Sequence, residues 1–196
     1  MRNAVVTVPA YFDNNQIDAT KKACEMAGLD CRKLLKEPTA AAIAYGIDKG
    51  TESLKRCLVF DFGGGTLDIT ILKLENRQIE VIAVTGDSNL GGVDIDNLLV
   101  KHCIEEFKRD DGSGEEGADL SQNQRAIARI RKACVDKKHE LIQTPDIEIR
   151  VEDIIDGKDL NVEISRGQFN ELCSELFERA LRPVDKAIQD AKLLKT

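Results

Sequence analysis

The segment from Asp61 to Asp68, which reads Asp-Phe-Gly-Gly-Gly-Thr-Leu-Asp, most strongly restricts the folds that this chain can adopt. Strand-like runs precede and follow it, at residues 57–62 and 66–74, so the glycines are predicted to form the turn of a β-hairpin. Glycines weaken a sheet, but successive backbone N–H groups that no side chain covers form a concave nest for a phosphate group. The pattern therefore indicates either a phosphate-binding hairpin or a plain hairpin.

The two carboxylates at the mouths of the turn favour phosphate binding. One of Asp61 and Asp68 could hold a hydrated Mg²⁺ ion, while the other could orient a water molecule or act as a base. The segment is not a Walker phosphate loop, because it lacks a lysine at a helix start. It is not a Rossmann loop either, because a strand follows the glycines where that motif needs a helix.

A second glycine-rich segment, residues 86–92, lies between a predicted strand at 79–85 and a predicted helix at 93–109. A helix N-terminus attracts anions, so this segment is another natural phosphate site. Asp94 and Asp96 lie in the first turn of that helix and complement its dipole, so simple helix capping is the alternative.

Strands and helices follow one another along the rest of the chain, which predicts an α/β fold with a smaller α+β part. Pro9 ends the first valine-rich strand, and Asp13 with Gln16 is predicted to cap the next helix. Polar stretches at 48–55 and 110–117 are predicted to be a boundary and a loop. The other predicted elements are strands at 4–8, 29–35, 147–155 and 160–164, the last two joined by a turn at 156–159, and helices at 13–28 and 40–45. Three later helices are also predicted. The first begins at a Ser121–Gln124 capping box and runs to about Ile142, the second begins at a Ser165–Gln168 capping box, and the third begins at Pro183.

The charge and hydropathy exclude several classes of function. The chain has 28 Lys and Arg against 35 Asp and Glu, and its net charge of −7 argues against general binding to nucleic acid. No apolar run approaches the roughly 18 residues of a membrane-spanning helix, and the first residues do not form a signal peptide. We therefore expect a cytoplasmic or nuclear protein without a membrane or nucleic-acid partner.

The cysteines and histidines give no sign of a metal centre. The six cysteines are scattered without a C-x-x-C pair, at positions 24, 31, 57, 103, 134 and 173. This pattern fits a reducing compartment, and Cys103, Cys134 and Cys173 are expected to be small buried apolar residues. His102 and His139 lie in helical stretches without ligand spacing, so we expect neither to bind a metal or act as a base.

Three segments, taken in order, resemble signatures of one family. They are residues 3–12 (NAVVTVPAYF), residues 37–46 (EPTAAAIAYG) and residues 61–68. These are similar to consecutive motifs of the heat shock protein 70 family, the ATP-driven chaperones with an actin-like ATPase domain. The resemblance implies an actin-like (ribonuclease H-like) fragment. Residues 1–50 would end the first lobe, 51–109 would form the second-lobe sheet and helix with the phosphate hairpin, and 110–196 the smaller second-lobe subdomain.

The resemblance also implies roles for individual residues around ATP or ADP and Mg²⁺. The residues matching the loop around the β- and γ-phosphates are Gly63, Gly64, Gly65 and Thr66, with Thr66 near the attacking water. The catalytic acids around that water would be Glu37, Asp61 and Asp68, of which Glu37 and Asp61 would hold Mg²⁺ through water. Farther along, Gly91 and Gly92 match glycines on the nucleotide side of the cleft, and Lys138 matches a lysine that reaches the ribose.

The sequence also departs from the family pattern at several positions that would contact the nucleotide. At the adenosine wall, Val93 stands where the family usually has an acidic residue, and Val135 stands where it usually has Glu. His139 stands where the family usually has Arg, and Ile142 where it usually has Ser. The family's first phosphate loop and catalytic lysine are not among these 196 residues, so the chain alone is expected not to hydrolyse ATP efficiently.

The family's partners would be J-domain co-chaperones, nucleotide-exchange factors and, through a substrate-binding domain, unfolded client proteins. The main alternative is a nucleotide-independent module that binds co-chaperones or exchange factors. An actin-like sugar kinase would share the hairpin but not residues 37–46.

Overall fold

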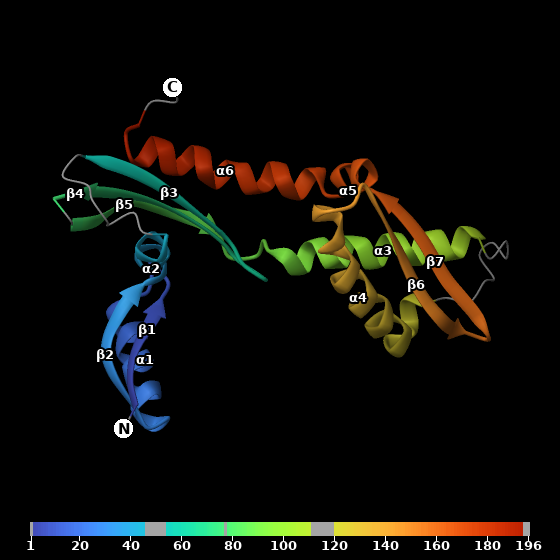
Figure 1. Ribbon diagram of the computed structural model, residues 1–196, viewed down its shortest axis with the longest axis horizontal. Helices are drawn as coiled ribbons and strands as arrows, with labels where there is room; N and C mark the ends of the chain where they lie inside the picture. Colours follow the sequence, from blue (N-terminus) through green and yellow to red (C-terminus); the bar gives the residue numbers. More distant parts are fainter. Residues whose placement is uncertain (1, 46–53, 77, 111–119, 194–196) are drawn as a thin grey trace. The chain divides into compact units, whose positions relative to one another are not determined.

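The computed structural model describes residues 2–45, 54–76, 78–110 and 120–193 (Figure 1). It forms two compact units: Met1–Asn89 with Ala180–Thr196, and Leu90–Arg179. The predicted boundary at 48–55 and loop at 110–117 fall almost entirely outside the described residues, and the division into three sequence segments stays a prediction. In the described part of the chain, no helix is both long and apolar enough to cross a membrane.

The first unit begins with a β-α-β arrangement and a short helix. Strands β1 (Arg2–Val8) and β2 (Leu29–Lys36) pair in parallel, helix α1 (Asn14–Met26) connects them, and α2 (Glu37–Ala44) follows directly. The predicted cap is confirmed, because the Asp13 carboxylate accepts a hydrogen bond from the Gln16 N–H at 2.8 Å and the Gln16 side chain returns one to the Asp13 N–H. Gly28 has a φ of +73°, which lets the chain reverse between α1 and β2.

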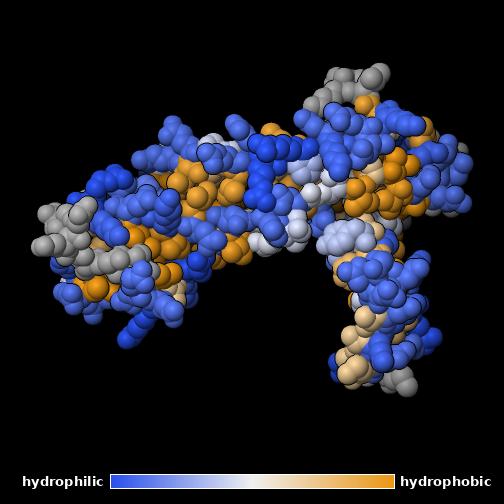
Figure 2. Space-filling view, turned by 180° about the vertical axis from the view of Figure 1, so that it is seen from behind, coloured by the Kyte–Doolittle hydropathy of each residue, from blue (hydrophilic) through white to orange (hydrophobic). Residues whose placement is uncertain are grey.

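The predicted meander is confirmed as a three-stranded antiparallel sheet of β3 (Lys55–Phe62), β4 (Leu67–Glu75) and β5 (Gln78–Asp87). Central strand β4 is almost entirely buried, and its Leu72 and Leu74 pack with Ala42 of α2. This packing holds α2 against one face of the sheet. Apolar side chains also lie on the surface around this sheet (Figure 2). On β3, Leu58 and Phe60 are exposed.

The second unit is an α+β arrangement with its own core. It contains α3 (Gly92–Asp110), α4 (Gln124–Lys138), the hairpin of β6 (Asp146–Ile155) and β7 (Lys158–Ser165), and α5 (Arg166–Leu172). The hairpin turn has Asp156 and Gly157 at φ of 50° and 75°, as an Asp-Gly turn of type I′ requires. Apolar side chains of the hairpin pack with those of α3 and α4, among them the fully buried Cys103 and Cys134.

Three helix starts differ from the sequence prediction. Helix α2 begins at Glu37 and not at Ala40, because Pro38 fits the first turn of a helix, where its missing N–H is not needed. The N-cap of α4 is Asn123, whose side chain accepts from the Ala126 N–H at 3.1 Å, and α4 ends at Lys138 before a separate 3-10 turn at Glu140–Ile142. Ser121 instead lies within a 3-10 turn at Leu120–Gln122, so the α-helix and its cap begin only after that turn. Ala126, Ile130 and Cys134 form the buried face of α4.

Pro183 does not open a helix, because α6 (Ser174–Asp190) runs through it. Ala180, Pro183 and Ala187 are buried at helical spacing, and burial of this face compensates for the hydrogen bond that proline cannot donate. The Ser165–Gln168 cap is confirmed, but its helix ends at Leu172.

Candidate phosphate and magnesium site

The glycine hairpin places two carboxylates opposite each other on one sheet face. Asp61 of β3 and Asp68 of β4 are direct partners in the antiparallel register, and the Gly63 N–H donates to the Thr66 carbonyl at 2.8 Å to close the turn. Residues directly opposite in such a pair have Cβ atoms about 5 Å apart, so like charges repel. The sheet therefore concentrates negative charge at one end of the hairpin.

Helix α2 adds a third carboxylate to the same face. Glu37 is its first residue, and with Asp61 and Asp68 it lines a small recess. The other lining residues are Ala10, Pro38, Val59 and Thr70. The fold thus brings together the three acidic residues that the sequence singled out, from three different elements.

The electrostatics of this recess follow from burial and from mutual repulsion. Burial, followed by the nearby charges of Asp61 and Asp68, raises the pKa of Glu37 above its usual range. Burial and the charge of Asp61 also raise the pKa of Asp68, although a hydrogen bond from the Thr66 side chain opposes that rise. Both carboxyls would be better stabilised as anions by an added cation.

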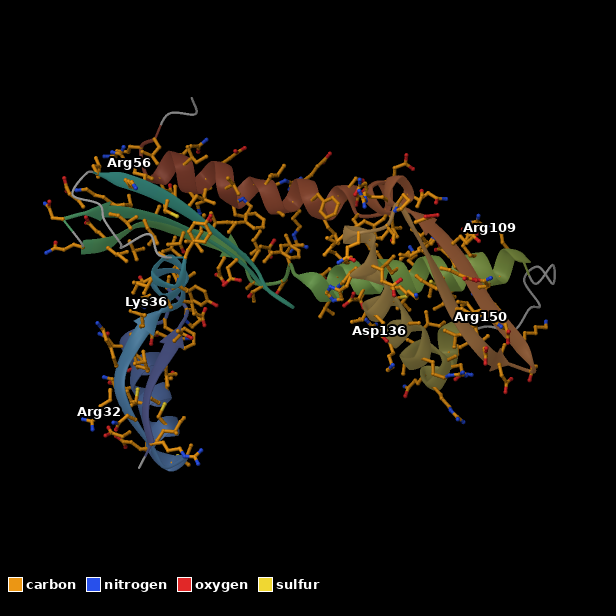
Figure 3. The ribbon with its side chains drawn as sticks, in the orientation of Figure 1. Arg32, Lys36, Arg56, Arg109, Asp136 and Arg150 are labelled. Atoms are coloured by element: carbon orange, nitrogen blue, oxygen red, sulfur yellow. The ribbon has the colours of Figure 1, made fainter. Side chains whose placement is uncertain are left out.

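Two neighbouring residues were missed by the sequence reasoning. Tyr11 lines a second recess of about 320 Å³ together with Thr66, Asp68 and Gly86, and burial with the charges of Asp68 and Glu37 raises its pKa. The Lys36 ammonium, at the end of β2 (Figure 3), donates to the carbonyls of Pro9 at 3.4 Å and Phe12 at 3.3 Å. Lys36 therefore ties the loop that carries Tyr11 to the start of α2. The proximity of Tyr11 to the glycine motif has no local sequence signal.

Two of the three turn glycines, Gly64 and Gly65, are not needed for packing within the protein, whereas a Cβ at Gly63 would lie 3.3 Å from the Thr66 carbonyl oxygen. A Cβ atom added at Gly64 or Gly65 would meet no atom within 4 Å, so the space beside this backbone is open. A Cβ at Gly86 would instead lie 2.2 Å from the Leu67 carbonyl oxygen, so that glycine is required by the sheet itself. Open space beside exposed N–H groups is what a phosphate nest needs.

The carboxylate set fits a hydrated cation better than a directly ligated one. Oxygen donors suit Mg²⁺, which usually keeps several of its waters. In the described residues, no group of three or more His, Cys, Asp or Glu side chains lies close enough to form a direct metal cage. Glu37 and Asp61 could therefore hold Mg²⁺ through water molecules.

The remaining predicted residues lie in the second unit. The Gly91 N–H donates to the Asp94 carboxylate at 2.8 Å, which is the capping alternative for the second glycine segment, and Gly92 begins α3. The Lys138 ammonium lies 2.6 Å from an Asp96 carboxylate oxygen, and both side chains are largely buried. In this structure Lys138 is thus held by an acid of α3.

The four altered wall residues also lie in this unit. Val93 is 49% exposed at the start of α3, and Ile142 is 78% exposed after α4. Val135 and His139 occupy the end of α4 and its C-cap, on the same helix end as Lys138. The effect of these four residues on nucleotide binding stays a prediction.

Comparison with known proteins identifies the class. The family model described as Hsp70 protein matches residues 1–196. A heat shock 70 kDa protein of Neurospora crassa is 45% identical over the whole chain. Heat shock cognate 70 kDa protein 3 of Dictyostelium discoideum is 43% identical, and chaperone protein DnaK of Nitrosopumilus maritimus is 42% identical, each over 98% of the chain.

The chain belongs to the Hsp70 family, and its mixed helices and sheets are those of the actin-like ATPase domain. It spans 30% of the length of each of these three relatives.

Proposed function

We propose that this chain supplies the phosphate-binding and water-orienting part of an Hsp70 ATPase domain, which hydrolyses ATP to ADP and phosphate. The observation that carries the proposal is the meeting of Glu37, Asp61 and Asp68 on one sheet face, beside a glycine turn with open space at Gly64 and Gly65. Phosphoryl transfer to water depends on positioning and charge neutralisation, and needs no covalent nucleophile.

Each residue then has a distinct task. The N–H groups of Gly64 and Gly65 bind phosphate oxygens, and the Gly63 N–H holds the turn closed through the Thr66 carbonyl. The Thr66 hydroxyl orients the attacking water. Glu37 and Asp61 hold the waters of a Mg²⁺ ion, which supplies positive charge against the phosphate oxygens when it is bound. Asp68 lies beside Thr66, and its raised pKa makes it a better acceptor for a proton from that water.

The proposal includes the wider activity of an Hsp70 chaperone. The complete protein would bind ATP or ADP with Mg²⁺, act in the cytoplasm on unfolded client proteins, and work with J-domain co-chaperones and nucleotide-exchange factors. The family membership and the relatives' printed names support this reading.

A second candidate is a nucleotide-independent binding module. Leu90–Arg179 forms a compact unit with its own apolar core, and its Lys138 is already paired with Asp96. Exchange-factor binding that persists with nucleotide removed, in a chain that does not bind Mg-ADP, would favour this candidate over the ATPase role.

The decisive experiment compares hydrolysis and binding in a complete Hsp70 chain that carries these residues. We expect Glu37→Gln, Asp61→Asn and Thr66→Val each to slow single-turnover hydrolysis by roughly 10²-fold, with a much smaller change in ATP affinity, because they act on metal and water. Asp18→Asn is a matched control, since this carboxylate is exposed on α1. Unchanged hydrolysis in all three variants would contradict the proposed site.

A further inference from the structure

Two cysteines face the same interface in the β-α-β part of the first unit. Cys24 is the one buried residue of α1, and α1 packs on β2, whose third residue is Cys31. Gly28 reverses the chain between them. Four helical residues place Cys24 about 6 Å from the reversal, and three extended residues place Cys31 about 10 Å from it, so both lie near the same end of the interface.

The orientation of Cys31 follows from its neighbours on β2. The exposed Arg32 (labelled in Figure 3) donates to the Asn3 side chain at 3.1 and 3.2 Å and pairs with Asp30 at 2.9 Å. Asp30 and Asn3 are partners in the parallel register, while Cys31 is paired with Ala4 before a bulge. Side chains alternate along a strand, so Cys31 lies on the face opposite Asp30, where α1 packs.

The Cys24 and Cys31 thiols also interact with each other. Burial is the main cause that raises the pKa of Cys24, and the neighbouring Cys31 thiol adds to it through charge and hydrogen bonding. Cys24 is only 7% exposed, whereas Cys31 is half-buried and reachable from solvent.

We propose that Cys24 and Cys31 form a dithiol that hydrogen peroxide oxidises to an intrachain disulfide. The sulfur of Cys31 attacks peroxide, the O–O bond breaks, and the products are a sulfenic acid and one water. The Cys24 sulfur then attacks the sulfenic sulfur, the S–O bond breaks, and the departing hydroxide takes the Cys24 proton to form a second water. Two thiols lose two electrons and two protons, and one peroxide is reduced to two waters.

The other cysteines explain why this pair should react first. Cys103 and Cys134 have their sulfur atoms 3.9 Å apart, but both are 0% exposed within the core of the second unit. Cys173 is also 0% exposed, and the half-buried Cys57 lies on a different sheet, in β3. Thiol oxidation requires access, so the closed pair at 103 and 134 is an internal control for the open pair at 24 and 31.

The sequence makes the product simple to detect in the folded 196-residue chain. Trypsin cuts after Lys22 and Arg32, so the peptide Ala23–Arg32 contains both cysteines of the pair and none of the other four. After brief peroxide treatment, alkylation and digestion, we expect this peptide to carry no alkyl group and to be about 2 Da lighter than the reduced peptide, reversibly with dithiothreitol. The exposed Met26 in the same peptide can gain one oxygen, and that form is read separately.

Single variants separate the pair from general thiol oxidation. Cys31→Ser should leave Cys24 alkylatable after peroxide, Cys24→Ser should send Cys31 to sulfinic acid or a mixed disulfide, and Cys57→Ser should change nothing in the Ala23–Arg32 peptide. Circular dichroism checks that the variants fold, and the wild-type result stands without them. Full alkylation of Cys24 and Cys31 while Cys57 is oxidised, or faster disulfide formation between Cys103 and Cys134, would overturn the proposal.

Discussion

Gly86→Ala should loosen the sheet that carries the candidate site. Gly86 of β5 is the register partner of Asp68, and an added Cβ would lie 2.2 Å from the Leu67 carbonyl oxygen and 3.3 Å from its carbon. Ordinary Cβ contacts begin near 3.4 Å and almost none are shorter than 3.0 Å, so β5 must move away from β4 by about 1 Å. Such overpacking against backbone costs about 2 kcal/mol, which lowers the melting temperature of a protein of this size by roughly 4–8 °C.

Thermal unfolding followed by circular dichroism measures this loss, and hydrogen exchange locates it. Amides of β4 and β5 should exchange faster in Gly86→Ala, while those of the β6–β7 hairpin in the second unit should not change. Gly64→Ala is the matched control, because a Cβ there meets no atom within 4 Å. If Gly86→Ala melts at the wild-type temperature, or if Gly64→Ala loses as much stability, the packing argument is wrong.

Three further predictions concern the site and its neighbours. Gly65→Ala should melt like the wild type but bind Mg-ADP more weakly in calorimetric titration, because its methyl group enters the open space beside the turn. Folding raises the pKa of Asp68 above its usual 3.8, which means that the protonated carboxyl favours the folded state. This gain in stability is fully present below pH 3.8 and is lost as the pH rises through the folded-state pKa. Asp68→Asn should therefore stabilise the metal-free chain at pH 7, by about 1 kcal/mol or less, and not near pH 3; urea unfolding at the two pH values tests this sign. Lys138→Met should cost about 3 kcal/mol in urea unfolding because it leaves the Asp96 carboxylate unpaired, and adding Asp96→Asn should restore part of that loss.

Local signals in the sequence predicted much of the fold. Both the Asp13–Gln16 and Ser165–Gln168 capping boxes form, and the glycine hairpin and the Asp-Gly turn lie where expected. Each depends on groups a few residues apart, so the neighbouring residues suffice to define it. Helix α4 shows the limit, because Ser121 has the expected capping sequence but lies within a 3-10 turn, and Asn123 caps the helix instead.

The sequence by itself determined the family, the order of the elements and the acidic and glycine residues of the candidate site. Only the tertiary structure decided that Glu37 of α2 lies on the same sheet face as Asp61 and Asp68, that Tyr11 joins Thr66, and that Lys138 pairs with an acid 42 residues away. The physical reason is that strand register and helix packing select these contacts. Both are settled by burial of apolar side chains distant in sequence, such as Ala42 against Leu72, and not by the charged residues that the packing brings together.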